Sequence, residues 1–298
     1  MCGIVGLLVK KPAWRERLGA LMVPMLTGMT ERGPDSAGLA VYTEPVADAD
    51  HKLSLYRGVH AVDWAALVGD LERAISGEHR MFANGNHAVL TSTANPDDIA
   101  AWLGKHAPLV AVLAIGRAID LYKDVGAPAE IAERYRFKYL RGSHLVGHTR
   151  MATESAVTPA HAHPFTAGRD FCLVHNGSLS NPHLVRKKLE PLGIEFETDN
   201  DTEAACRFFE WRLREGDDLE SAVQRGFSEL DGFFTFLMGT DRELLIVRDA
   251  FACKPAIVAE TDDYVAIASE FRSLAHLPGI RHADIFEPKP EEIYRWRV

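Results

Sequence analysis

Strand-length apolar runs lie at both ends of this 298-residue chain, and they constrain its fold more than any other feature. The run "GIVGLLV" (3–9) predicts a buried first strand. Near the other end, four runs predict successive strands of a meander, namely "FFTFLM", "LLIVR", "PAIVAE" and "YVAIAS". Amphipathic helices are expected between them, over 14–29 and 219–230. Because each sheet must cover its apolar face, this order predicts an α+β fold of layered sheets covered by helices.

Residues 44–140 differ in character from the rest of the chain. They contain two expected amphipathic helices (63–75 and 97–104), an alternating strand "HAVLT" and an apolar run at 108–115. No spacing typical of a catalytic site occurs there. We interpret this stretch as an inserted lobe of mixed α/β character.

Charge and cysteine content exclude several classes of protein. With 33 basic and 42 acidic residues the net charge is −9, which argues against a nucleic-acid or anionic-membrane partner. The longest uncharged apolar stretch, "APLVAVLAIG", is about half of the ~20 residues that a membrane helix needs, and the start of the chain lacks the regions of a signal peptide. Four scattered cysteines form no CxxC pair, so a reducing, cytoplasmic location is expected.

The chain opens "MCGIVG", which places a cysteine directly after the initiator methionine. Removal of Met1 would make Cys2 the first residue and bring its thiol next to a free α-amine. With an unperturbed pKa of about 7.7–8.0, that amine can accept the thiol proton and later give it to a leaving amine. Cys2 is therefore a candidate nucleophile that carries its own base, although a small buried side chain at the start of a strand is the alternative.

Four further motifs have both a chemical and a purely structural interpretation. "HNG" places the Asn176 amide beside the Gly177 backbone N–H, as an oxyanion hole requires, but "NG" is also a common hairpin turn. "GHTRMAT" offers Arg150 and Thr153 for a substrate carboxylate. "TDNDTE" offers carboxylates for a substrate ammonium, or simply a helix start with Asp201 or Thr202 as N-cap. "RGPDSAG" is a tight turn flanked by glycines.

Together, "MCGIVG", "RGPDSAG", "GHTRMAT", "HNG" and "DTE" occur in the order found in class-II glutamine amidotransferases, which are N-terminal-nucleophile (Ntn) hydrolases. The chain resembles this family over roughly 2–43 and 144–275. The resemblance implies a four-layer αββα sandwich spanning 2–298, with the insertion at about 44–140. It also implies hydrolysis of glutamine to glutamate and ammonia, without a cofactor or a metal.

The resemblance also implies a role for each motif residue. Cys2 would be the nucleophile, and Asn176 with Gly177 would form the oxyanion hole. Glutamine would be held at its α-carboxylate by Arg150 and Thr153, and at its α-ammonium by Asp201 and the Gly177 carbonyl. The pocket around the nucleophile would be shaped by Arg32 and Asp35.

The sequence departs from the family pattern at three places. Met151 stands where many members have Trp, and Glu154 stands where many have His. The usual "DPxGxRP" of the last strands is "DAFACKP" (249–255) here.

As a whole, the chain looks most like the separate amidotransferase subunit of N-methylglutamate synthase and related glutamate-synthase-like systems. We therefore expect a separate synthase subunit that receives ammonia, and low activity until that subunit docks.

Three other interpretations remain open. Five histidines between 144 and 175 suggest a metal site, but no HExxH or paired CxxC accompanies them. A catalytically silent scaffold or regulatory subunit is the second, although Cys2 and Asn176 are both present. The third is an amide-cleaving acylase of the same superfamily, but such enzymes commonly need a propeptide to expose the nucleophile.

Overall fold

Two stacked antiparallel sheets form the centre of the molecule. The computed structural model describes residues 2–58, 63–151 and 157–298. The first sheet has the strand order β15 (Asp284–Phe286), β13 (Ile257–Glu260), β14 (Tyr264–Ala268), β1 (Gly3–Val9), β8 (His144–Arg150), β2 (Ser36–Tyr42) and β7 (Ile119–Val125). The second has the order β16 (Tyr294–Arg297), β12 (Glu243–Arg248), β11 (Gly232–Gly239), β10 (Phe171–Leu179) and β9 (Phe165–Ala167).

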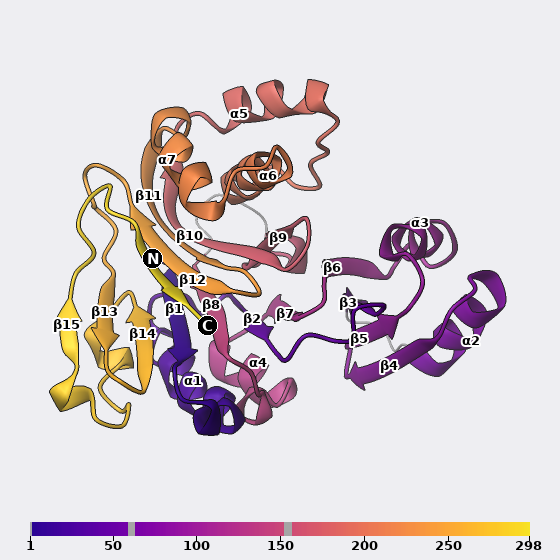
Figure 1. Cartoon of the computed structure of the whole chain (residues 1–298), viewed down its shortest axis with the longest axis horizontal. Helices are drawn as coiled ribbons and strands as arrows, with labels where there is room; N and C mark the ends of the chain where they lie inside the picture. The colour runs from indigo at the N-terminus through magenta and orange to yellow at the C-terminus, as the bar shows by residue number, and fades with distance from the viewer. Residues whose placement is uncertain (1, 59–62, 152–156) are drawn as a thin grey trace.

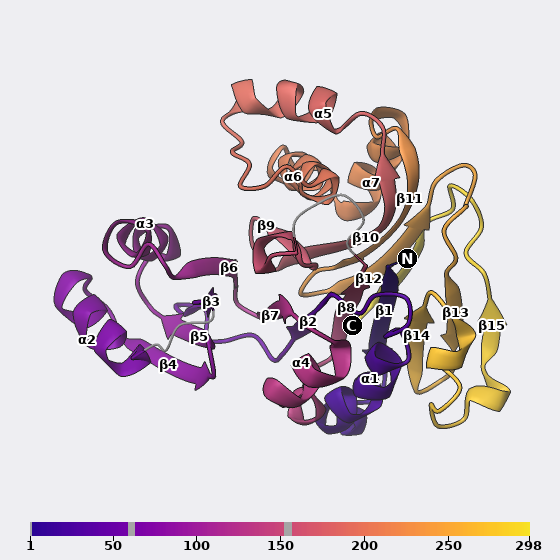
Figure 2. The same ribbon diagram turned by 180° about the vertical axis from the view of Figure 1, so that it is seen from behind.

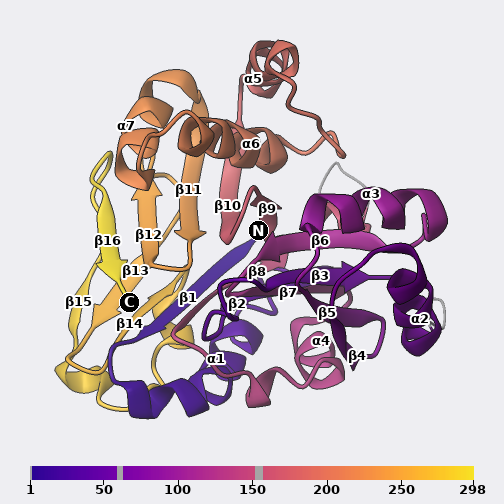
Figure 3. The ribbon, with the colours of Figure 1, turned by 45° about the vertical axis from the view of Figure 1, so that its right-hand side comes forward.

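Helices cover the outer face of each sheet, which gives four layers (Figures 1 and 3). Against the first sheet lie α1 (Leu18–Thr27) and α4 (Pro128–Arg134), and against the second lie α5 (Pro182–Leu189), α6 (Asp201–Arg214) and α7 (Leu219–Glu229). Short 3-10 turns occur at Pro12–Arg17, Phe137–Tyr139, Pro159–His161, Glu190–Leu192, Phe271–Ser273 and Ile280–His282. The predicted α+β fold with an αββα arrangement is confirmed.

Three apolar cores hold the four layers together. Strand β1 contributes to two of them, which explains why its sequence is apolar throughout. Val5, Leu7 and Val9 face the helices α1 and α4. Ile4 and Leu8 point the opposite way, into the core between the two sheets. A third core joins the second sheet to α5, α6 and α7. Because β1 is buried on both faces, its sequence lacks the alternation of a strand with one solvated face.

Three details differ from the sequence-based expectations. The four C-terminal runs do not form one meander: β11 and β12 pair in the second sheet, whereas β13 and β14 pair in the first. The segment "DAFACKP" between β12 and β13 therefore crosses from one sheet to the other, which strand periodicity alone cannot reveal. The helix expected over 14–29 begins as a 3-10 turn, and α1 proper starts at Leu18.

The third difference concerns the start of α6. Its N-cap is Asn200, whose side chain accepts a hydrogen bond from the Thr202 N–H, and Asp201 is already the first helical residue. The predicted N-cap at Asp201 or Thr202 was therefore wrong by one or two positions. The difference matters because the Asp201 carboxylate does not cap its own helix and instead turns toward β10.

A separate four-stranded sheet projects to one side of the sandwich (Figures 1 and 2). Its strand order is β4 (His79–Asn84), β5 (His87–Ser92), β3 (His51–Tyr56) and β6 (Ala111–Gly116), and α2 (Trp64–Ala74) and α3 (Pro96–His106) share its apolar core. Within the range 44–140, β7 and α4 belong to the sandwich. The boundaries of the insertion as a domain stay a prediction.

Asp170 fastens the chain where it returns from this lobe to the sandwich. Its carboxylate, in the turn between β9 and β10, accepts backbone N–H bonds from Arg117, Ala118 and Ile119 at 2.7–2.9 Å. Gly116 leaves room for it, because a Cβ there would lie 2.1 Å from Asp170 Oδ1. No helix among the described residues is long and apolar enough to cross a membrane.

We expect Asp170→Ala to lower the free energy of unfolding by about 3 kcal/mol, because three backbone N–H groups in a poorly hydrated turn would lose their hydrogen-bond acceptor. Urea denaturation would measure the change. Asp97→Ala is the matched control: Asp97 pairs with the neighbouring Arg169 on the surface, and its loss should cost less than about 1 kcal/mol. Equal losses for the two variants would contradict the role assigned to Asp170.

Candidate functional site

The candidate site is centred on Cys2, directly before β1. Its backbone carbonyl accepts hydrogen bonds from Arg32 Nε at 3.0 Å and from Asn176 Nδ2 at 3.3 Å. Arg32 lies in the turn between α1 and β2, whereas Asn176 lies on β10 of the other sheet. Cys2 is partly exposed, and its Sγ lies 3.9 Å from the Met151 carbonyl oxygen. Three segments that are far apart in the sequence thus meet at Cys2.

The Arg32 side chain is fixed by a residue that the sequence analysis missed. Glu270, just after β14, accepts from Arg32 Nη1 at 2.9 Å, and this hydrogen bond holds the pKa of Glu270 below its ordinary value. The preceding Ser269 exchanges hydrogen bonds with Ile4. An acidic residue directly after a buried strand was the available signal for Glu270, but nothing in the sequence indicated its partner.

Gly177 can only be a glycine. Its φ is 151°, and a Cβ there would lie 1.9 Å from the Phe233 carbonyl oxygen on the neighbouring β11. Asn176 is buried in register with Thr235, while the backbone of Gly177 is exposed. The amide of Asn176 and the backbone N–H of Gly177 are therefore adjacent donors at the same end of β10 as Cys2.

The residues predicted to hold the substrate lie at the ends of neighbouring elements. Arg150 ends β8 and is 5% exposed, and its carbonyl accepts from the Asp35 N–H at 3.0 Å. Asp201 Oδ2 accepts from the Leu179 N–H at 2.8 Å, which fastens the start of α6 to the end of β10. Thr153, and the departure at Glu154, lie outside the described residues.

Directly behind these residues lie three buried histidines. His148 Nε2 contacts the His175 carbonyl oxygen at 3.1 Å, and its ring stacks on His163 with the ring centres 4.1 Å apart. The Thr202 hydroxyl contacts both His163 Nε2 (2.9 Å) and His175 Nδ1 (3.0 Å). Each member of this histidine cluster is within two residues of a predicted site residue or shares Thr202, the neighbour of Asp201.

Burial keeps the histidine cluster neutral. It lowers the pKa of His148 to about 3, and it also lowers the pKa values of His163 and His175. Within the described ranges, no group of three metal-ligating side chains is placed to hold an ion. Of the five histidines that crowd the sequence between 144 and 175, His148, His163 and His175 form this cluster, whereas His144 stacks on Tyr42 and His161 contacts Asp199.

Comparisons with known proteins place the chain in a family. A family model described as "Glutamine amidotransferase domain" matches residues 148–276. The glutamine amidotransferase-like protein GlxB of Rhizobium meliloti (strain 1021) is 45% identical over 297 residues, which cover 99% of this chain and 98% of that protein. The chain belongs to the glutamine amidotransferase family. A putative glutamine amidotransferase of Methanothermobacter thermautotrophicus is 32% identical over 99% of both chains.

Two solved structures share the fold of the chain. Glutamine phosphoribosylpyrophosphate (PRPP) amidotransferase from B. subtilis, complexed with ADP and GMP, superposes with a TM-score of 0.62 at 17% identity. A structure described as the allosteric regulatory enzyme of purine biosynthesis gives 0.64 at 18% identity. Each match covers 99% of this amidotransferase chain but only 49% and 46% of the respective solved chain, so the chain spans about half their length.

The lowered pKa values of the buried histidines predict how the stability of the chain depends on pH. A histidine whose folded pKa lies below its unfolded value of about 6.5 contributes stability above pH 6.5 that is lost as the pH falls toward the folded pKa. His87 and His144, also with pKa values lowered to about 3 by burial, add to the effect. Each histidine should lower the free energy of unfolding by up to about 1.4 kcal/mol per pH unit below 6.5.

Thermal midpoints measured from pH 8 to pH 5 would test this dependence. Carboxylates such as Glu270, whose pKa lies below its ordinary value, stay ionised over that range and do not contribute. A midpoint that stays constant between pH 7 and pH 5 would show that the histidines are not held neutral.

Proposed function

We propose that this chain hydrolyses glutamine to glutamate and ammonia through a thioester on Cys2. The observation that carries the proposal is the pair of hydrogen bonds that Arg32 and Asn176 donate to the Cys2 carbonyl oxygen. These two hydrogen bonds hold the backbone of Cys2 next to the side-chain amide of Asn176, and Gly177 follows Asn176 on β10. Family membership supports glutamine as the substrate.

In the proposed reaction, removal of Met1 frees the α-amine of Cys2, which takes the thiol proton. The thiolate attacks the side-chain amide carbon of glutamine, and the Asn176 amide with the Gly177 N–H stabilises the oxyanion. The intermediate collapses as the ammonium of Cys2 returns its proton to the departing nitrogen, which leaves as ammonia. Water then attacks the thioester, which breaks the C–S bond, releases glutamate and regenerates the free thiol. The Asn176 amide has two N–H donors, so it can bind the oxyanion while one N–H still contacts the Cys2 carbonyl oxygen.

Recognition of glutamine is assigned to the ends of β8 and α6. Arg150 would pair with the α-carboxylate, together with Thr153. Asp201, whose side chain is 26% exposed, would accept from the α-ammonium together with the Gly177 carbonyl. Arg32 and Asp35 would shape the pocket from the turn before β2. A positive charge at the end of β8 and a negative charge at the start of α6 suit a zwitterionic amino acid.

Glutamate release from glutamine by the purified chain tests the proposal, after mass spectrometry has confirmed that Met1 is absent. We expect Cys2→Ala to lower the rate at least about a thousandfold, because no other group replaces the nucleophile. A glutamine-mimicking electrophile should label wild-type protein at Cys2 and leave Cys2→Ala unlabelled. Absence of both release and labelling in the wild type would favour a scaffold or regulatory role.

We further propose that the ammonia passes to a separate synthase subunit, in an assembly similar to N-methylglutamate synthase or a glutamate-synthase-like system. Two exposed aromatic rings next to the site support a partner there. Phe233 and Phe251 are 47% and 73% exposed, their ring centres lie 5.6 Å apart, and Phe233 directly flanks Gly177. All four cysteines are free, which fits an assembly in the reducing cytoplasm.

Docking of the synthase should raise glutamine turnover at least about tenfold, since ammonia is useful only when it is kept from solvent. Turnover would be compared between the isolated chain and the complex co-purified from the native host. Equal rates would contradict gating but leave the hydrolysis itself untouched.

A further inference from the structure

A buried lysine from the stretch 44–140, Lys123 on β7, holds a segment beside the candidate site. Its ammonium donates to the Ala162 carbonyl oxygen at 3.0 Å and makes longer contacts of 3.5 Å with those of Ala160 and Pro164. The side chain is 6% exposed and lies over the Phe165 ring. An ammonium has three N–H donors, so Lys123 can bind all three carbonyls at once.

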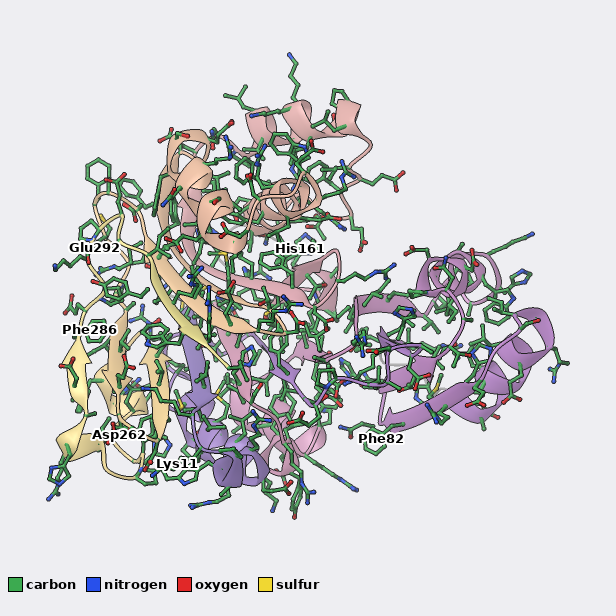
Figure 4. All side chains as sticks on the ribbon, in the orientation of Figure 1. Lys11, Phe82, His161, Asp262, Phe286 and Glu292 are labelled. Atoms are coloured by element: carbon green, nitrogen blue, oxygen red, sulfur yellow. The ribbon has the colours of Figure 1, made fainter. Side chains whose placement is uncertain are left out.

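The segment held by Lys123 carries His163. Its neighbour Ala162 and the following Pro164 supply two of the three carbonyls, so the backbone on both sides of His163 is fixed. From the other side, a Cβ on Gly38 of β2 would lie 2.1 Å from the His163 carbonyl oxygen, so the segment sits directly on the sheet. His161, which is labelled in Figure 4, is anchored separately, because its Nε2 lies 2.9 Å from Asp199 Oδ1.

His163 in turn contacts the elements that carry the proposed substrate-binding residues. Its Nε2 lies 2.9 Å from the Thr202 hydroxyl, next to Asp201 on α6. Its ring stacks on His148, which is two residues before Arg150 on β8. A shift of the His163 backbone would therefore move the supports of both residues.

We propose that Lys123 is a positioning residue for glutamine, which acts by clamping the backbone around His163 so that Asp201 and Arg150 stay in place to bind the α-amino and α-carboxylate groups. This inference rests on the proposed hydrolysis of glutamine. It gives the stretch 44–140, in which the sequence showed no catalytic spacing, a role in the binding of glutamine.

The chemistry of the lysine agrees with a clamp on backbone carbonyls. Burial lowers the pKa of Lys123 to about 8, so it is still mostly charged at pH 7. No carboxylate among the described residues lies within ion-pair distance of its Nζ; Glu197 and Glu203 act on it only from farther away. The contrast is Lys52, another buried lysine of the same stretch, which forms an ion pair with Asp120.

The test measures the rate at which a glutamine-mimicking electrophile labels Cys2, at several concentrations of the electrophile. Such a series separates the affinity for the electrophile from the labelling rate at saturation. Lys123→Met keeps the length of the side chain and removes the donors. We expect it to weaken the affinity for the electrophile about tenfold, because Arg150 and Asp201 would be displaced from their binding positions. The labelling rate at saturation should stay within about threefold of wild type, because the nucleophile itself is unchanged. Lys123→Arg, which restores charge and donors, should recover most of the affinity.

Lys52→Met is the matched control, since it removes a buried lysine that contacts Thr43 and Ala118 and not the clamped segment. It should lower the thermal midpoint without changing the affinity. If Lys123→Met does not fold, Lys123→Gln, which keeps an amide donor, replaces it.

The outcomes are distinct. An unchanged affinity in Lys123→Met or its replacement, or an equal loss in Lys52→Met, would overturn the positioning role. If the wild type itself is not labelled, the proposed hydrolysis fails first, and the inference fails with it.

Discussion

The carbonyl oxygen of Cys2 is bound by side chains from two different layers, and the rest of the candidate site depends on these contacts. Arg32 reaches it from the turn before β2 of the first sheet, and Asn176 reaches it from β10 of the second. The Asn176 contact requires that β1 lie over β10 in the stacked sandwich. The apolar core between the sheets thus sets the distance between the Cys2 backbone and the Asn176 amide. Glu270 completes the support, because its carboxylate neutralises the buried guanidinium of Arg32.

The polar groups around Cys2 differ in charge with their position. The charged side chains Arg150 and Asp201 lie at the ends of their elements. Behind them the histidine cluster supplies hydrogen bonds without charge, since burial lowers the pKa values of its members. Lys123 contacts the segment that carries His163 and donates to its backbone carbonyls. Neutral polar groups directly behind charged binding residues avoid competing with them for the substrate's charges.

Much of this arrangement could be predicted from the sequence, because it rests on local patterns. The bounds of β1 follow from an apolar run buried on both faces, and short motifs identified the residues that meet around Cys2. The partition of the last four strands between two sheets could not be predicted, because β12 and β13 have the same pattern in either sheet. Glu270 and Lys123 were missed for a related reason: their partners are distant in sequence, and a charged residue beside a buried strand is usually solvated.

The way the lobe joins the sandwich has a consequence for how the chain folds. Strands β2 and β7 pair up to Tyr42 and Ile119, so the whole lobe occupies the place of a hairpin turn. Its own strands close in short steps: β4 and β5 meet across a tight turn, β5 pairs with β3, and β3 then pairs with β6 from Lys52 to Gly116. Each step shortens the remaining loop, and loop closure costs less entropy for a shorter loop. A lobe that has already folded therefore delivers β7, with Lys123 on it, to the edge of a sheet that it could otherwise reach only through a long random search.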